Sequence, residues 1–528
     1  MGTNSTRRSP HVLLSTEGTY PFIMGGVSTW CEALVSGIAD VQWHVLAITA
    51  GGLRRESLFE FPTNVASVTR RELWSDSRLA TASPWTRRPV RTDLAAALAN
   101  GLLGWDSSVN DLIEALVWCR KNPGGVRPSF RATAGWQSFL DVLSRHNSAE
   151  LHFTQADAAE IYQTLLWVAR AAAERTRTDP KADPIDLHLV TAAGWAGIGS
   201  VIDCELDPKP LVLAEHGVYV RESYLGSVRN STSRQAQRWF ASRLARGLAR
   251  LVYDRATIVA PVTQANAAWE RHLGVNDERI RPIYNGVVVP PTVRPFPAKQ
   301  RIVSIGRLDP LKDIATSLRA AAIVVAARPD VQFVHYGPVP DGNDNYAAMC
   351  ARLHEELRLG DRFILAGPTD DPMGTFAQSS MAFFSSISEG FPVAVLEAMA
   401  CGRPVVATAV GGVPEALSGC GLTVRPGDYQ GLAAGLLRLV NDPVLQRRLG
   451  ERSYARVREE FGMANCLQNY RDLFVELTGL PIADPEHVVF DRNDTDLDLG
   501  PSDGDHFGDI TSGELAPRPA RSGIDYAE

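Results

Sequence analysis

Short apolar runs alternate with amphipathic segments along most of the chain. The runs are rich in Val, Ile, Leu and Ala, and most of them end at a glycine or a polar turn. The segments that follow repeat their apolar residues with helical periodicity. This alternation is typical of parallel strands joined by helices, and it predicts a doubly wound α/β fold. We expect strands at 11–14, 41–48, 186–191, 211–214, 256–262, 301–305, 331–336 and 363–366.

The alternation breaks off over a long segment in the first half of the chain. From about residue 57 to 184 the pattern becomes helical and irregular, and we interpret it as a helical insertion. Tryptophans are scattered through this insertion. We expect them to fill a local core, and a sugar-binding platform is the alternative for Trp74, Trp85, Trp105, Trp118, Trp136 and Trp167.

A cluster of prolines divides the chain at Pro290, Pro291, Pro295 and Pro297, where the backbone is stiff and pairs poorly. A chain of 528 residues is too long for one hydrophobic core and suits two domains. We therefore expect an N-terminal domain at 11–290 and a C-terminal domain at 301–478. The last helix of the second domain is expected to pack back on the first.

The composition changes after residue 480 to Asp, Gly, Pro and Ser with few large apolar residues. We expect residues 481–528 to form a disordered acidic tail. Asp494, Asp496 and Asp498 alternate as in a metal-binding loop. However, Gly500 comes one place too late for an EF-hand, and Asp505 stands where that loop needs Glu. The sequence therefore predicts no metal site.

Charge and cysteine usage narrow the class of protein. The net charge is −7 and no block of Lys or Arg stands out, so a nucleic-acid partner is not expected. The seven cysteines are odd in number and never form a C-x-x-C pair, as in a reduced cytosolic protein. We find no secretory signal and no apolar stretch long enough for a membrane helix. The expected location is the cytoplasm.

The richest chemistry lies in residues 385–415, where two carboxylates stand eight residues apart. Glu389 precedes Gly390, Phe391 and Pro392, and a helical run from Val393 contains Glu397. A small-residue turn that opens a helix favours an anion such as a phosphate. The two carboxylates offer acceptors for ribose or sugar hydroxyls. The alternative is an ordinary strand, turn and helix with both glutamates solvated.

A second turn carries two cations, Arg307 and Lys312, after Gly306. Their spacing across a strand-to-helix turn suits a diphosphate, which Arg binds with a planar fork and Lys with a compact charge. The alternative is a surface ion pair with Asp309 or Asp313. Glycines at two later strand ends, Gly337 and Gly367, are candidate walls of a nucleobase pocket.

The first half of the chain adds a glycine pair and a histidine. Gly25 and Gly26 open a helix, and adjacent glycines let backbone approach a ligand closely. By spacing alone, plain turn chemistry explains them equally well. His216 follows a predicted strand, and ligands collect at the carboxyl ends of strands in an open parallel sheet. A lone histidine is nevertheless more often structural.

Taken together, these motifs resemble a known family. The E-x7-E arrangement with G-F-P, followed by A-M-A-C-G-R-P-V-V-A-T and G-G-V-P-E, is similar to the donor-binding half of GT-B retaining glycosyltransferases of family 4. The segments LLSTEGTYPFIMGGVSTW and AEHGVYVRES more narrowly resemble PelF-type enzymes of exopolysaccharide synthesis. The two resemblances cover about residues 11 to 478, and residues 277–287 resemble the last strand of the family's first domain.

The resemblance implies a reaction and a set of roles. Two Rossmann-like domains would face each other across a cleft, the first on the acceptor side and the second binding the donor. A hexose would pass from a UDP-linked donor to a sugar or polysaccharide acceptor with retention. It implies that His216 and Glu389 face the donor sugar and that Glu397 holds the ribose. No cofactor and no obligatory metal are expected. The remaining donor contacts would come from Gly25, Gly26, Gly306, Arg307, Lys312, Gly337, Gly390, Phe391, Pro392 and Val393.

Two other classes of function remain as alternatives. A catalytically silent nucleotide-sugar-binding subunit of a polysaccharide export complex would keep the fold and lose the charges of the cleft. A GT-B sugar-nucleotide epimerase would need no acceptor. Peripheral association with a membrane polysaccharide-synthesis complex is compatible with the PelF-type likeness.

Overall fold

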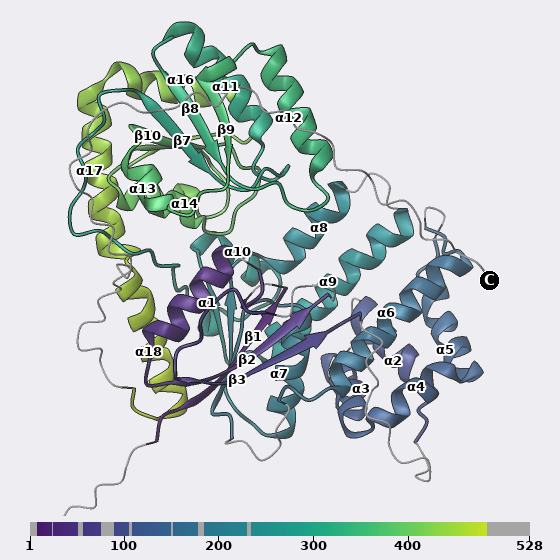
Figure 1. Ribbon diagram of the computed structural model, residues 1–528. Coiled ribbons are helices and arrows are strands. Elements are labelled where there is room, and N and C mark those ends of the chain that lie inside the picture. The colour runs from purple at the N-terminus through teal and green to yellow at the C-terminus, as the bar shows by residue number, and fades with distance from the viewer. Residues whose placement is uncertain are drawn as a thin grey trace, which may run out of the picture. The chain divides into compact units, whose positions relative to one another are not determined.

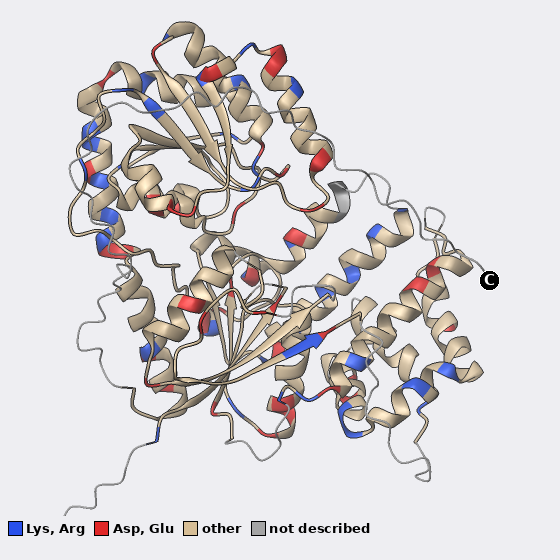
Figure 2. Cartoon of the chain, viewed as in Figure 1, with Lys and Arg blue, Asp and Glu red and all other residues tan. Residues whose placement is uncertain are grey.

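The computed structural model describes residues 8–18, 20–23, 25–50, 56–74, 89–104, 108–148, 151–177, 184–229 and 234–482. Within these residues, two six-stranded parallel sheets carry the fold (Figure 1). The alternation of apolar runs and helical segments therefore predicted the architecture correctly. The charged residues of the strands lie at or near strand ends, as at the end of β3 with Arg70 and Arg71 (Figure 2).

The first sheet has the strand order β3-β2-β1-β4-β5-β6. Strand β1 lies between β2 and β4, since Val12 pairs with Trp43 of β2 and with Leu187 of β4. The chain therefore builds one side of the sheet up to β3 and then continues with β4 on the other side of β1. Such a switch point is where open α/β sheets bind ligands. The strands are β1 (His11–Glu17), β2 (Gln42–Thr49), β3 (Val65–Glu72), β4 (Leu187–Val190), β5 (Leu211–Glu215) and β6 (Ile258–Pro261).

Four helices of this half matter for the site. They are α1 (Gly26–Gly37), α7 (Trp195–Leu206), α8 (Tyr219–Arg229) and α9 (Gln235–Arg255). A fifth, α10 (Gln264–His272), is capped by Thr263, whose hydroxyl accepts a hydrogen bond from the Asn266 N–H at 3.0 Å.

The helical insertion begins later than predicted. Strand β3 lies inside the range 57–184 and pairs with β2 at the edge of the sheet. The error has a physical cause, since an edge strand is only partly buried and its sequence VASVTRRE lacks an apolar run. The helices follow at α2 (Leu94–Leu103), α3 (Val109–Lys121), α4 (Pro123–Arg131), α5 (Thr133–Ser144) and α6 (Gln155–Ala173).

The tryptophans of the insertion divide into two groups. Trp118, Trp136 and Trp167 pack against the hydrophobic core of the first half. Trp74 is 45% exposed and meets Trp167 and Trp195 edge to face. Trp85 and Trp105 lie outside the described residues.

The strand expected at 277–287 is not formed. A short 3-10 helix, η1 (Asp277–Arg279), occupies its start, and a single bridge joins Ile280 to Val259. Pro282 has no N–H to add to a ladder, and the stretch keeps two backbone hydrogen bonds to β6, from Arg281 to Val259 and from Ile283 to Pro261, so it lies along the edge of the sheet without forming a regular strand.

The second sheet has the order β12-β11-β10-β7-β8-β9. Its strands are β7 (Arg301–Ile305), β8 (Gln332–Tyr336), β9 (Phe363–Gly367), β10 (Met381–Phe384), β11 (Val405–Thr408) and β12 (Leu422–Val424). They pack against α11 (Ile314–Ala327), α12 (Asp344–Glu356), α13 (Pro372–Ala377), α14 (Val393–Ala400), α15 (Val413–Ala416) and α16 (Tyr429–Asn441).

Two final helices carry the chain back to the first sheet. Helix α17 (Pro443–Glu460) packs on α14, and α18 (Met463–Thr478) packs on α1 (Figure 1). The Phe474 ring lies 6.0 Å from that of Trp43, and the Arg471 guanidinium donates to the Gly37 carbonyl. None of the described helices combines the length and apolarity that a membrane crossing requires. The predicted tail lies outside the described residues from residue 483 on, including the alternating aspartates.

Candidate functional site

Glu389 and Lys312 form an ion pair between two turns at the carboxyl end of the second sheet. The Lys312 Nζ lies 2.5 Å from Glu389 Oε1, and Ser386 donates to the same oxygen at 2.6 Å. Glu389 retains 12% of its side-chain exposure and Lys312 retains 25%. The glutamate is therefore not a solvated surface residue, and the structure joins two residues that are 77 positions apart in sequence.

Asp309 organises the turn that carries the two cations. Its Oδ1 accepts the N–H groups of Leu311 and Lys312 at 2.8 and 3.2 Å. Its Oδ2 lies 3.1 Å from Arg307 Nε, so the ion pair that the sequence left as an alternative is present. Arg307 still exposes 60% of its side chain, whereas Asp309 exposes 8%. The guanidinium therefore has donors left for a ligand, and Lys312 is held toward Glu389.

Two of the predicted glycines meet because the strand ends approach closely. A Cβ on Gly337 would lie 1.8 Å from the Gly306 carbonyl oxygen, so no side chain fits there. Gly306 donates to the Tyr336 carbonyl at 2.8 Å and lies against the Lys312 side chain. The turns after β7 and β8 thus form one surface beside the ion pair.

The turn after β10, here named the glutamate turn because it carries Glu389, contacts the end of the first sheet directly. A Cβ on Gly390 would lie 1.9 Å from the His216 carbonyl oxygen, and Arg221 donates to the Glu389 carbonyl at 3.0 Å. On the other side, Gly412 donates to the Gly390 carbonyl at 2.8 Å. Backbone contacts from both halves of the chain therefore fix the glutamate turn.

His216 stands at this contact, at the end of β5. Its ring lies 4.5 Å from the Trp30 ring, edge to face. Burial lowers the pKa of the imidazole to about 4, and the opposing hydrogen bond with Asn285 is weaker. Its Nε2 has no hydrogen-bond partner among the described residues. The histidine is thus neutral at physiological pH, and its buried Nε2 lacks a hydrogen bond from the described residues.

Two helix N-termini converge beside the ion pair. Helix α14 starts at Val393, and a Cβ on Gly26, the first residue of α1, would lie 3.8 Å from a Val393 methyl group. Space is open around Gly25. The positive ends of both helix dipoles therefore face the same region, which favours an anion there.

The remaining residues of the turn differ in what they can contribute. Phe391 is buried against Tyr284 and Phe461, so only its backbone is open to a ligand. Pro392 has no N–H and sets the start of α14. Glu397 is partly buried on the same helix.

The sequence did not indicate several residues that the structure adds. Nothing in the sequence indicated that Trp30 packs against His216 or that Arg221 binds the Glu389 carbonyl. Glu415 stood out in the sequence only as the last residue of the G-G-V-P-E motif. In the structure its carboxylate accepts a hydrogen bond from the Gln264 N–H at 3.0 Å and so caps α10 of the first half. Such contacts join distant segments and leave no local pattern.

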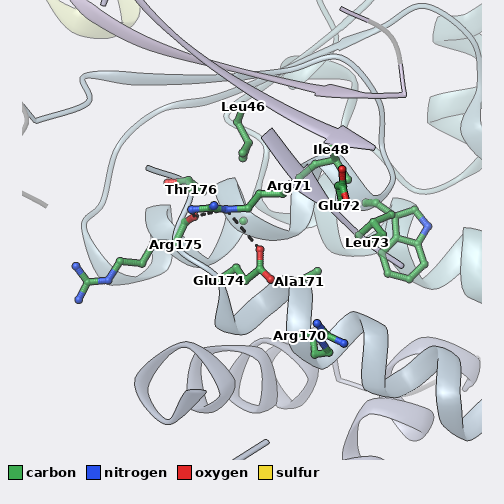
Figure 3. A pocket seen from close by; sticks show the side chains of 12 residues that line it. Leu46, Ile48, Arg71, Glu72, Leu73, Arg170, Ala171, Glu174, Arg175 and Thr176 are labelled. Atoms are coloured by element: carbon green, nitrogen blue, oxygen red, sulfur yellow. Dashed lines mark hydrogen bonds and ion pairs between the residues drawn. The ribbon is translucent and has the colours of Figure 1, made fainter. Parts of the chain in front are cut away.

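The cavity drawn in Figure 3 lies elsewhere, between the end of β3, α6 and α7. Arg71 reaches across it to Glu174, 3.4 Å away. Its volume of about 30 Å³ suits one or two water molecules rather than a sugar, and no predicted site residue lines it. Across the described residues, no three His, Cys, Asp or Glu side chains gather as they would around a metal ion.

Parts of the chain are similar to known proteins. The catalogued relatives include a D-inositol 3-phosphate glycosyltransferase of Streptomyces bingchenggensis, 32% identical over 216 residues, which are 39% of this chain and 47% of that protein. An N-acetyl-alpha-D-glucosaminyl L-malate synthase of Bacillus anthracis is 32% identical over 128 residues, 24% of this chain and 34% of its own. The chain thus spans about a third to a half of the length of these relatives.

Solved structures show the fold. Anabaena HepE, crystallised with UDP and glucose, aligns with 89% of this chain and 100% of its own at a TM-score of 0.56 and 16% identity. Sucrose-phosphate synthase of Thermosynechococcus elongatus aligns over the same shares at 0.55 and 21%. These likenesses confirm a GT-B fold of two Rossmann-like domains.

Two family descriptions match different parts of the chain. Residues 299–442 match "Glycosyl transferases group 1", which covers the turns of Arg307, Lys312, Glu389 and Glu397. Residues 10–278, about half of the chain, match "Domain of unknown function (DUF3492)". The chain belongs to the DUF3492 family, with a C-terminal half of the group 1 glycosyltransferase type.

Proposed function

We propose that this protein is a retaining glycosyltransferase that moves a hexose from a nucleotide diphosphate sugar to a sugar or a growing polysaccharide. One observation carries the proposal: the turn of Glu389, which the ion pair joins to Lys312, also contacts His216 and lies beside two converging helix N-termini. A diphosphate needs cations and backbone dipoles, and a sugar needs carboxylate acceptors. Both kinds of group are present within one small region.

The leaving diphosphate explains the positive groups. When the bond to the sugar breaks, the new charge on the phosphate is stabilised by Lys312, by Arg307 and by the N-terminus of α14. Lys312 is then shared between the phosphate and Glu389, which is left to bind the sugar hydroxyls. In this proposal Glu397 holds the ribose. Departure and attack then take place on the same face of the sugar, as the family-4 likeness implies.

The identity of the substrates extends the proposal. A UDP-linked donor follows from the family-4 likeness, and HepE is a protein of this fold that binds UDP. A growing exopolysaccharide as acceptor follows from the PelF-type likeness of the N-terminal half, as does peripheral association with a membrane polysaccharide-synthesis complex. All seven cysteines are unpaired, which suits a cytoplasmic site of action.

The test is incubation of the purified protein with a panel of nucleotide sugars, with and without oligosaccharides. We expect release of the nucleoside diphosphate that depends on the acceptor, with an anomeric configuration preserved in the product by NMR. Isomerised donor without acceptor would identify an epimerase instead. Binding of donor without turnover across the panel would identify a silent subunit.

Turnover is expected to survive excess EDTA. The helix N-terminus and the two cations already place opposite charge beside the diphosphate, whereas a metal-dependent transferase needs carboxylates that hold Mg²⁺ or Mn²⁺. The measurement is the initial rate before and after chelation, with Glu397→Ala as a variant that should lose activity under both conditions. Loss of the rate in EDTA with recovery in Mn²⁺ would refute both the metal-free mechanism and the roles of the two glutamates.

A further inference from the structure

Two glutamates lie in contact behind His216, completely removed from solvent. Glu215 ends β5 and Glu270 lies on α10, and each has 0% exposure. Their carboxyl groups are within hydrogen-bonding reach of each other. Two ionised carboxylates in this position would repel each other without water to screen them, so the pair cannot carry two charges.

The hydrogen-bond donors around the pair are divided unequally. Glu215 Oε1 accepts the Tyr219 N–H at 3.2 Å, and Oε2 accepts the Tyr253 hydroxyl at 2.7 Å. In the described part of the chain, no donor reaches either oxygen of Glu270. A buried carboxylate without a donor is strongly unfavourable, whereas a neutral carboxylic acid can donate to its neighbour. The geometry therefore puts the charge on Glu215 and the proton on Glu270.

The charges that face the pair from surrounding elements do not reverse this assignment. Burial raises the pKa of Glu270 to about 10, and the negative charge of Glu215 acts in the same direction. Burial also raises the pKa of Glu215, and Glu222 of α8 adds to this, whereas the hydrogen bonds from Glu270, Tyr253 and Tyr219 lower it, so Glu215 is the carboxyl group of the pair that keeps the charge. The Tyr253 hydroxyl of α9 stays protonated because its pKa lies well above the ordinary value. The one cation that opposes this is Arg271, whose effect on Glu270 is the weakest of these.

We propose that Glu270 is a neutral carboxylic acid whose O–H donates a hydrogen bond to the Glu215 carboxylate. This hydrogen bond positions the His216–Gly217 turn and the start of α8 against the turn that carries Glu389 and Gly390. Glu215 holds the first N–H of α8, Tyr219, and directly precedes His216. His216 in turn contacts Gly390 through its carbonyl group. Glu270 is thus a positioning residue that acts through Glu215. The consequence for activity rests on the proposed function, whereas the shared proton does not.

The variant Glu270→Gln tests the shared proton, because its amide can donate in place of the acid. In the parent protein the folded pair binds one proton that the unfolded chain releases above the ordinary glutamate pKa. Stability therefore falls as pH rises toward the folded pKa of about 10. We expect the unfolding constant of the parent to rise about tenfold per pH unit relative to the variant between pH 6 and 9. Denaturant melts at four pH values measure this difference.

The control is Glu278→Gln, an exposed glutamate of the same half, which should follow the parent at every pH. Infrared difference spectra of parent and Glu270→Gln at pH 8 should show the band of one protonated carboxyl group that the variant lacks. Parallel pH curves, a missing band, or a Glu270→Gln variant that does not fold would each overturn the proposal. If Glu270 has the positioning role, kcat should stay within about twofold of the parent in Glu270→Gln and fall in Glu270→Ala. Equal rates in the two variants would refute the positioning role. The denaturant melts would still test the shared proton independently.

Discussion

Replacing Lys312 by methionine is expected to lower kcat/KM by a factor of about 10² to 10³. Two effects combine. The variant loses the cation that meets the leaving diphosphate, and it leaves the Glu389 carboxylate, 12% exposed, without its partner at 2.5 Å. An uncompensated carboxylate beside the phosphates repels them. A loss of this size corresponds to about 3–4 kcal/mol of transition-state stabilisation.

The two effects can be separated by a double variant. Lys312→Met combined with Glu389→Gln removes the unpaired charge, so donor binding measured by calorimetry should partly recover while turnover stays low. Arg307→Ala is expected to cost about tenfold, since its side chain is more exposed and already paired with Asp309. Lys299→Met, at an exposed position outside the turns, serves as the control and should match the parent. If Lys312→Met turns over donor at the parent rate, Lys312 does not stabilise the leaving diphosphate.

Gly390→Ala is expected to reduce kcat/KM by at least about a hundredfold. The added methyl group would stand 1.9 Å from the His216 carbonyl oxygen, a distance that no carbon–oxygen contact tolerates. Relief requires the glutamate turn to move away from the first sheet, and this also breaks the bond from Arg221 to the Glu389 carbonyl. Small displacements of positioned groups have large kinetic costs.

Gly226→Ala is the matched control for this variant. Gly226 is an exposed helical glycine with nothing within 4 Å of an added Cβ, so alanine should leave activity unchanged and raise the melting temperature slightly. Calorimetric melts of Gly390→Ala should show that both halves remain folded. A folded Gly390→Ala protein with the parent rate would mean that the contact between Gly390 and His216 plays no part in the reaction.

Most strands could be predicted because their signal is local. A strand buried on both faces needs a continuous apolar run, so β1, β2, β5 and β7 stood out from the sequence. Strand β3 did not stand out, because it lies at the edge of the sheet, where it is only partly buried and can carry polar residues instead of an apolar run. The stretch at 277–287 was wrong in the opposite direction, since it pairs with β6 only through the isolated bridge of Ile280 to Val259 and two neighbouring backbone hydrogen bonds and forms no regular strand.

The candidate site was predictable residue by residue but not as an arrangement. Glycines and charges at strand ends identify Gly306, Lys312, Glu389 and Gly390 without any knowledge of their neighbours. Their pairing was not visible. Whether Arg307 binds Asp309, and whether Glu389 is solvated, depends on which turns lie next to each other in space.

The sequence by itself therefore determined which segments become strands and helices and which turns hold reactive side chains, because hydrophobic periodicity and turn chemistry act over a few residues. The tertiary structure alone decided which charges are paired, which are buried and which must stay protonated. Lys312 reaches Glu389, Gly390 meets His216, and Glu270 shares a proton with Glu215 only after the sheets have formed. The energy of a charge depends on its distance to other charges and to water, and the folded chain sets both distances.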